Sequence, residues 1–251
     1  MRQVSIRVKL TVAAASLALL FAHEMAAQAA TAGYALIYNG KAAAEGGPEA
    51  VAAVARDIGL EVKFLSDPDR LPEMLPGAAV FVIGGTEDDL SPLIKAFTPK
   101  ILGALKDWLS AGGRYWGICG GGYLASEGWE DTDGFVKAFG LVPAVSMAYI
   151  ENPDPRIISV IWQGKERAMY YQYGPSFAPD KASGTEVVAS YDDGTIAALA
   201  ARFGKGKVAV VGPHPEADDS WLDDDPRPKN SDKWTSSADL AQAMLRDLLA
   251  P

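Results

Sequence analysis

The sequence has very few of the side chains that most often act as nucleophiles and proton carriers. Its 251 residues contain one cysteine, Cys119, and two histidines, His23 and His214. A single cysteine excludes an intrachain disulfide. In an oxidising compartment, a lone thiol is either buried as a small apolar side chain or kept for its chemistry.

The sequence also lacks an apolar run long enough to span a membrane comfortably. Its N-terminal run, LTVAAASLALLFA, is about 13 residues long and follows a basic segment that begins at Arg2. Small residues at Ala27-Gln28-Ala29 complete the pattern of a secretory signal peptide. We therefore expect residues 1–29 to be cleaved near Ala29, with Ala32 as a second candidate. Because no twin-arginine pair is present, we expect Sec-type export to the periplasm or the medium.

An excess of positive charge is absent as well. The formal charge of the chain is −9, and removing the signal residues Arg2, Arg7, Lys9 and Glu24 leaves −11. Such a surface repels nucleic-acid phosphates and anionic lipids, so we expect no nucleic-acid partner and no membrane partner after cleavage. A small molecule or a peptide-like substrate remains as the expected partner, and the sequence leaves the oligomeric state open.

The first half of the chain alternates strands with helices. Glycine-rich corners and helical spacing predict strands at 34–38, 60–65, 79–85 and 115–119, with helices at 48–59 and from Pro99 to an end at Gly112-Gly113. The segment DPDRLPEMLPG, from Asp67 to Gly77, is expected to be a loop. This alternation predicts a flavodoxin-like α/β fold, in which a mainly parallel sheet carries helices on both faces.

The second half predicts short strands that lack intervening helices. These strands are expected at 157–162, 168–173, 186–191, 195–203 and 207–212, and a last helix at 237–249. We expect antiparallel additions to the sheet and a single domain over residues 30–251. In parallel sheets, functional groups gather at the carboxyl ends of the strands.

The stretch RYWGICGGGYLAS places Cys119 directly after a predicted strand and before three glycines. A strand that turns at once into a helix needs glycines for clearance, and we expect the turn to hold an exposed thiol out at the edge of the sheet. The helix N-terminus there favours a thiolate and an oxyanion. The structural alternative is a glycine-rich turn with an inert buried thiol. By itself this motif does not decide between the two.

His214 is the one histidine that remains after signal cleavage, and it follows the apolar strand segment VAVVG. A lone histidine at a strand end is often structural. Here Glu216, two residues further on, offers a carboxylate to orient the imidazole, as a cysteine nucleophile and its base require. Cys119 and His214 both follow strands at the same expected edge, which favours a catalytic group of Cys119, His214 and Glu216.

Gly84 and Gly85 follow the strand AVFVI at the same expected edge. Adjacent glycines there can turn backbone amides toward a substrate, and we predict that they form an oxyanion hole with the amide of Gly120. An ordinary strand-to-loop turn is the alternative interpretation of this glycine pair.

With these motifs, the chain resembles the class I glutamine amidotransferase-like superfamily. The segment around Cys119 resembles its nucleophile elbow, His214-Pro-Glu216 the rest of its triad, and Gly84-Gly85 its oxyanion loop. Within that superfamily, the chain is most similar to the N-terminal domain of biotin-protein ligases, in a stand-alone exported form. The segments ALIYNG at 35–40, CGGGYLAS at 119–126 and YGPSF at 173–177 carry this resemblance, which extends from about residue 33 to 217. It implies that Tyr123 and Tyr173 lie in the pocket.

Two departures limit what the resemblance implies. Glutamine-hydrolysing members carry glutamine four residues after the nucleophile, where this chain has Tyr123, and many relatives have proline where it has Ile83. The chain has no ammonia-accepting synthetase domain and no biotin-ligase catalytic module, which argues against glutamine-fed biosynthesis and gives no basis for biotin transfer.

Two functions remain open at this stage. One is a cysteine hydrolase that acts on an amide or ester bond, with Cys119 as nucleophile, His214 as base and then acid, and Glu216 as the group that orients the imidazole. The other is a ligand-binding or regulatory protein that keeps the amidotransferase-like fold without turnover. No metal ion and no cofactor is expected for either.

Overall fold

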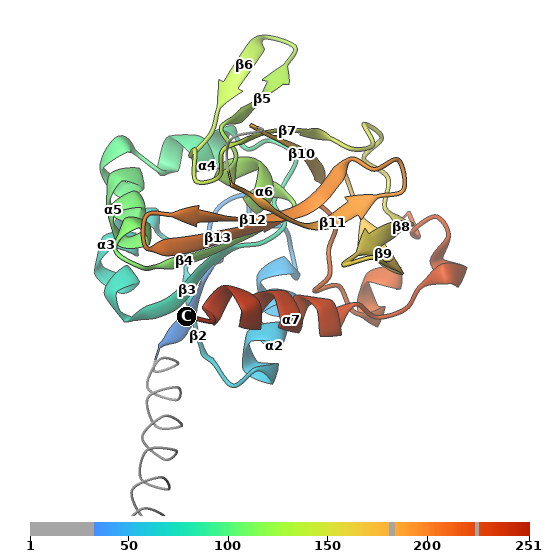
Figure 1. The fold of residues 1–251 in the computed structure, drawn as a ribbon, viewed down its shortest axis with the longest axis horizontal. Helices are drawn as coiled ribbons and strands as arrows, with labels where there is room; N and C mark the ends of the chain where they lie inside the picture. Colours follow the sequence, from blue (N-terminus) through green and yellow to red (C-terminus); the bar gives the residue numbers. More distant parts are fainter. Residues whose placement is uncertain (1–32, 181–183, 224–225) are drawn as a thin grey trace, which may run out of the picture. The chain divides into compact units, whose positions relative to one another are not determined.

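The fold is known from a computed structural model, which describes residues 33–180, 184–223 and 226–251. The predicted signal peptide lies outside the described residues. Residues Tyr34–Pro251 form one compact unit (Figure 1). Within the described ranges, no helix is both long enough and apolar enough to cross a membrane.

The N-terminal part of the unit supplies most of a parallel sheet. Its strand order is β2-β1-β3-β4-β13, and every neighbouring pair in this series is parallel. The five strands are β1 (Tyr34–Tyr38), β2 (Glu61–Leu65), β3 (Ala78–Ile83), β4 (Arg114–Ile118) and β13 (Gly206–Val211). This arrangement confirms the prediction of a parallel sheet in an α/β fold.

The sheet continues past β13 through strands that are mostly antiparallel, in the order β12-β10-β7-β5-β6, with β11, β8 and β9 branching from β12. These eight strands are β5 (Gly128–Asp131), β6 (Gly134–Lys137), β7 (Ala144–Ala148), β8 (Arg156–Trp162), β9 (Lys165–Tyr171), β10 (Pro175–Pro179), β11 (Glu186–Tyr191) and β12 (Ile196–Phe203). Antiparallel additions in the C-terminal half are therefore confirmed.

Helices cover both faces of the parallel part. They are α2 (Gly47–Asp57), α3 (Leu71–Met74), α4 (Ser91–Ala96), α5 (Pro99–Ser110), α6 (Gly120–Ala125) and α7 (Ala238–Leu249), with 3₁₀ turns at Pro68–Arg70, Leu75–Gly77, Asp219–Asp223 and Ser231–Lys233. Because side chains alternate across a strand, β1 sends Ala35 and Ile37 to one face and Leu36 and Tyr38 to the other.

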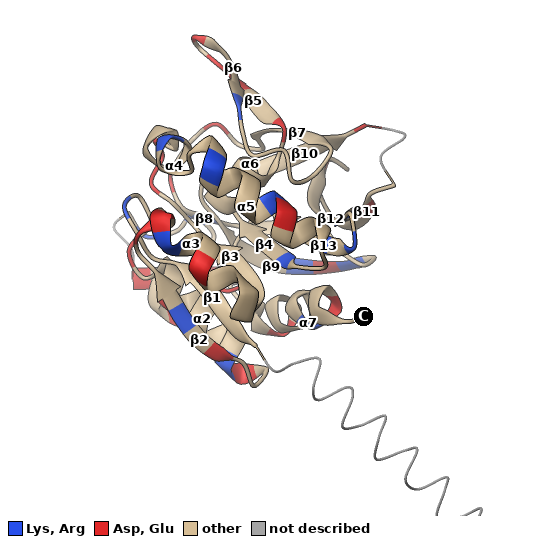
Figure 2. Ribbon diagram, turned by 90° about the vertical axis from the view of Figure 1, so that its left-hand side faces the viewer, with Lys and Arg blue, Asp and Glu red and all other residues tan. Residues whose placement is uncertain are grey.

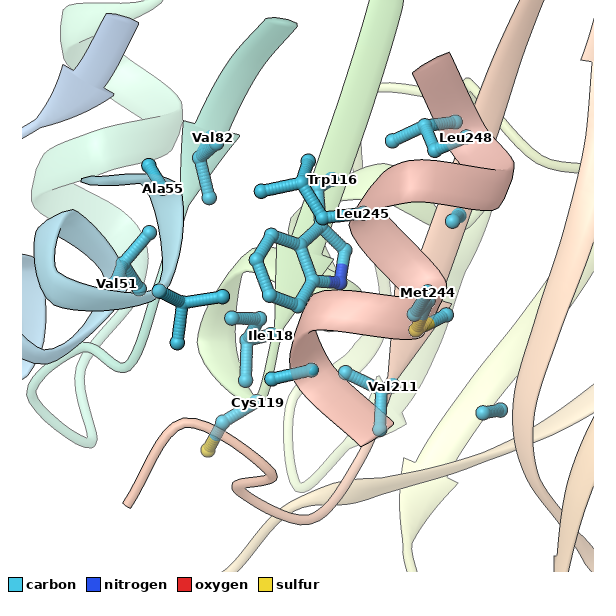
Figure 3. Packing of buried hydrophobic residues seen from close by; sticks show 14 of the residues in the cluster. Val51, Ala55, Val82, Trp116, Ile118, Cys119, Val211, Met244, Leu245 and Leu248 are labelled. Atoms are coloured by element: carbon cyan, nitrogen blue, oxygen red, sulfur yellow. The ribbon is translucent and has the colours of Figure 1, made fainter. Parts of the chain in front are cut away.

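Helices α2 and α7 pack side by side on the first face. Trp116 from β4 is fully buried there, against apolar residues of both helices such as Val51 and Leu245 (Figure 3). On the opposite face, α5 presents Ile101, Leu105 and Leu109 to a second apolar cluster. The side chain of Thr98 accepts a hydrogen bond from Ile101 N–H and caps the start of α5.

The structure contains three elements that the sequence analysis did not predict, α4, β7 and β10, and it differs from the sequence-based elements in two further regions. Residues 68–77, predicted as a loop, form two 3₁₀ turns around α3, because each of these short elements has a proline in its first turn, where its fixed φ suits a helix start. The hairpin of β5 and β6 was not predicted. Its sequence, GWEDTDGFVK, is mostly polar and exposed, so hydrophobic alternation does not mark it.

The parallel strands bring the site residues to one edge. Strands β3, β4 and β13 run in the same direction, so the residues that follow them meet at their carboxyl ends. Gly84 follows β3, Cys119 follows β4, and His214 comes three residues after β13 ends at Val211.

Candidate active site

Cys119 occupies a strained backbone conformation between β4 and α6. Its φ is 50° and its ψ is −111°, values that a residue with a side chain rarely adopts. The chain makes this turn because its neighbours are glycines: a Cβ on Gly121 would lie 1.9 Å from the carbonyl oxygen of Ile83. The sharp strand-to-helix turn inferred from the sequence is therefore present.

The thiol is less exposed than expected. The sequence predicted a thiol held out at the sheet edge, whereas Cys119 is only 8 % exposed and belongs to the apolar cluster under α2 and α7. Gln172, which directly follows β9, lies against it: Sγ is 3.6 Å from the carbonyl oxygen of Gln172. Cys119 still lines the cavity described below, so a ligand can reach it from that side.

His214 is held by its backbone and by its ring. Its backbone N–H donates to the carbonyl of Tyr170 at 2.8 Å, in an isolated bridge between the loop after β13 and the end of β9. Nδ1 of its ring lies 2.8 Å from Oε1 of Glu216, whose side chain is completely buried. The predicted contact between the imidazole and the carboxylate is thus present.

The electrostatic surroundings favour a protonated imidazole. Burial is the largest single influence and lowers the pKa of His214, but the Glu216 and Cys119 side chains oppose it by charge and by hydrogen bonding, and together they raise this pKa to about 10. The imidazole therefore interacts with the carboxylate on one side and with the thiol on the other. It carries a positive charge near neutral pH.

Aromatic rings and a glycine fix the plane of the imidazole. Tyr170 meets it edge-on at a centroid distance of 5.7 Å, and Trp221 lies at 5.1 Å. On another side, a Cβ at Gly85 would lie 3.1 Å from Cε1 of the ring. This close approach explains why a glycine stands at residue 85.

The three predicted oxyanion glycines have different positions. Gly85 and Gly120 line the cavity, and among the described residues neither backbone N–H is used in a hydrogen bond. Gly84 does not line the cavity. Its carbonyl accepts the N–H of Gly121 at 3.1 Å, and a Cβ on it would meet Val51, so Gly84 supports the elbow from behind.

Cys119 and His214 open into a cavity of about 980 Å³. Tyr123 and Tyr173 both line it, as the resemblance implied. The hydroxyl of Tyr123 donates to the carbonyl of Tyr173 at 3.4 Å, and its ring meets Trp129 edge-on at 5.5 Å. Burial raises the pKa of Tyr123, so its hydroxyl stays neutral and donates that hydrogen bond.

Several residues of the site were not predicted from the sequence. Trp129 reaches the cavity from β5, and Trp221 reaches it from the acidic segment DDSWLDDD, which composition alone marks as a solvated loop. Gln172 contributes a backbone carbonyl, which no side-chain pattern reveals. The one signal in the sequence is Gly174-Pro175, a pair typical of a turn. It directly follows Gln172 and Tyr173, and Tyr173 has a φ of 54° in the structure.

The comparisons with known proteins bear on the fold. Residues 150–248 match the model of the family "Biotin-protein ligase, N terminal", which is less than half of the chain and lies further toward the C-terminus than the resemblance inferred from the sequence. No curated protein is significantly similar to this chain.

Solved structures show the same fold. A glutamine amidotransferase is 18 % identical with a TM-score of 0.58, over 73 % of this chain and 91 % of that one. A glutamine amidotransferase from Thermotoga maritima is 14 % identical with a TM-score of 0.53, over 87 % and 95 %. A GH42 beta-galactosidase is 11 % identical with a TM-score of 0.54, over 86 % of this chain but only 29 % of the galactosidase. The chain has a glutamine amidotransferase-like fold, and its C-terminal part matches the biotin-protein ligase N-terminal family.

Proposed function

From the glutamine amidotransferase-like fold and the arrangement of Cys119, His214 and Glu216, we propose that this protein is a cysteine hydrolase that cleaves an amide or ester bond. The observation that carries the proposal is the buried imidazole, with Glu216 Oε1 at 2.8 Å from Nδ1 and the Cys119 side chain as its other partner. Both reacting side chains line a cavity large enough for a small molecule or a short peptide.

In the proposed reaction, the sulfur of Cys119 attacks the carbonyl carbon of the substrate, and its proton resides on His214. The oxyanion that forms lies near the N–H groups of Gly85 and Gly120, which have no other partner among the described residues. The imidazolium then donates its proton to the leaving amine or alcohol. Water, activated by the neutral imidazole, hydrolyses the thioester and restores the thiol.

Glu216 is a positioning residue in this scheme. Its carboxylate accepts the Nδ1–H of His214, which fixes the ring orientation and stabilises its charged form. The strained backbone at Cys119 supports the same function, because the sharp turn places the nucleophile next to the N-terminus of α6.

Trapping the thioester tests the proposal. The mature protein is mixed with an activated ester, and the mass added to Cys119 is followed with time by mass spectrometry. We expect rapid acylation followed by release of the acid. His214→Asn should acylate slowly and retain the acyl group, while the Cys119→Ser control should give no thioester. Equal acylation of the wild type and His214→Asn would contradict a role for the imidazole.

A second candidate function is ligand binding without turnover, and the burial of Cys119 favours it. Tyr123, at the position where glutamine-hydrolysing relatives carry glutamine, also places an aromatic ring in the lining, in edge-on contact with Trp129. Under this alternative, the thiol reacts with iodoacetamide no faster than an ordinary cysteine, and a bound ligand leaves unchanged.

We also propose that the protein acts outside the cytoplasm after removal of its N-terminal signal. The compact unit begins at Tyr34, shortly after the expected cleavage sites near Ala29 and Ala32. Mass spectrometry of a periplasmic fraction should find a chain that starts near Ala30 or Gly33. A full-length chain in the cytoplasm would contradict export.

A further inference from the structure

We propose that the cavity selects a positively charged substrate, an amide or ester that carries an amine or a guanidinium group. This inference rests on the proposed hydrolase and adds the class of its substrate. The observation behind it is the charge of the lining, which among the described residues contains six carboxylates but neither lysine nor arginine. The six are Glu45, Glu87, Asp88, Glu130, Asp131 and Glu151.

These carboxylates come from separate parts of the chain. Glu45 precedes α2, Glu87 and Asp88 follow β3, Glu130 and Asp131 belong to the β5–β6 hairpin, and Glu151 follows β7. Figure 2 shows acidic residues at the tip of that hairpin. The negative charge therefore surrounds the cavity and is not the product of a single acidic loop.

Among the described lining residues, the one side chain that can carry a positive charge is His214, and its charge is paired with Glu216, which lies outside the lining. The ion pairs among the described residues are Arg167 with Asp239, His214 with Glu216 and Lys229 with Asp154, and none of them includes a carboxylate of the lining. The whole chain has 32 acidic and 23 basic residues, so an average part of its surface would present both signs. A concave site with one sign of charge concentrates oppositely charged ligands.

The walls of the cavity suit an organic cation better than a metal ion. Within the described ranges, no three His, Cys, Asp or Glu side chains come close enough together to hold a metal. Trp129, Trp221 and Tyr173 also line the cavity, and aromatic faces attract ammonium and guanidinium groups. An extended cationic side chain can contact such a ring with its stem while its charge lies among the carboxylates.

Charged thiol reagents measure this selectivity at Cys119 without any turnover. The mature protein is treated with a trimethylammonium-ethyl or a sulfonato-ethyl methanethiosulfonate, and each rate is divided by the rate for a free small thiol. We expect the corrected rate to be on the order of 10-fold higher for the cationic reagent at low salt and to approach equality near 0.5 M salt. A ratio near one at low salt would overturn the inference.

Neutral variants test which carboxylates create the preference. Glu130→Gln with Asp131→Asn, and separately Glu87→Gln with Asp88→Asn, should each lower the ratio several-fold. The matched control neutralises two exposed carboxylates outside the lining, Glu61→Gln with Glu73→Gln, and should leave it unchanged. If the control lowers the ratio as much as the cavity variants do, the net charge of the protein and not its cavity accounts for the preference.

Binding of matched amides separates this inference from the proposed reaction. Ligand-observed NMR compares three Nα-acetylated amino-acid α-amides, those of lysine, norleucine and glutamate. Their side chains carry charges of +1, 0 and −1. We expect saturation transfer from the protein to the lysine compound only, whether or not that compound is cleaved. Binding of the lysine compound without acylation of Cys119 would refute the hydrolase alone, whereas acylation by neutral or anionic esters in preference to cationic ones would refute the cation preference alone.

Discussion

The N–H of Gly121, in the first turn of α6, donates to the carbonyl of Gly84 at 3.1 Å. This bond joins the turn that carries Cys119 to the glycine pair after β3. It exists because the backbones approach closely, with only 1.9 Å between the position of a Gly121 Cβ and the oxygen of Ile83. One backbone contact thus fixes the turn that carries Cys119 relative to the Gly84-Gly85 pair.

The first prediction compares two helical glycines. Gly121→Ala forces α6 away from Ile83, a backbone neighbour that cannot rotate aside, so we expect a loss of about 1–3 kcal/mol in the free energy of unfolding. Gly103→Ala in α5 is the matched control, because nothing lies within 4 Å of its Cβ position. It should stabilise the protein by about 0.5–1 kcal/mol, through higher helix propensity. Urea unfolding measures both, and equal effects would contradict this account of the elbow.

The second prediction concerns the reactivity of Cys119 toward iodoacetamide at pH 7. His214→Asn removes the positive charge next to the sulfur, and we expect the rate to fall about 10-fold or more. Glu216→Gln leaves an imidazole in place but weakens its orientation, so the fall should be smaller. Tyr123→Phe is the control, since it removes only a hydroxyl that lines the same cavity. If neither His214→Asn nor Glu216→Gln changes the alkylation rate, only the ligand-binding alternative remains.

The third prediction separates strain from packing at Cys119. Cys119→Ala removes a buried sulfur and should cost about 1 kcal/mol, more than expected for the exposed thiol that the sequence suggested. Cys119→Gly also removes Cβ, but it relieves the strain of a φ of 50°, of about 1–3 kcal/mol. The glycine variant should therefore be at least as stable as the alanine variant in urea unfolding. A much less stable glycine variant would mean that the turn stores little strain.

The sequence predicts the parallel half of the fold well, because buried strands there end in glycine signals. The strand at Tyr34–Tyr38 has the predicted bounds, and Thr98-Pro99 marks the start of α5 correctly. Strand signals of this kind also place Cys119 and His214 at one sheet edge. That edge is a consequence of parallel direction, which follows from the alternation of strands and helices.

Other features of the site could not be predicted, because they depend on contacts distant in sequence. The burial of Cys119 depends on Gln172, which is more than 50 residues away in the chain. Trp129 belongs to a polar hairpin, and the position of Trp221 next to His214 depends on how the loop after β13 folds back. The charge of the cavity lining also becomes visible only when these loops are brought together.

The last prediction concerns the pH dependence of stability. The protonation of His214 determines whether its contribution to stability rises or falls as the pH increases. Its pKa is raised from 6.5 to about 10 in the folded protein, so the folded state holds the proton more tightly than the unfolded chain does. This contribution is fully present below pH 6.5, declines between pH 6.5 and 10, and is lost above pH 10. The difference in unfolding free energy between the wild type and His214→Asn should therefore narrow by a few kcal/mol across that range, since one pKa unit corresponds to about 1.4 kcal/mol. Glu61→Gln is the control, and its difference from the wild type should stay constant. A gap that widens as the pH rises toward 6.5 and stays constant above it would mean that the buried imidazole is neutral in the folded protein.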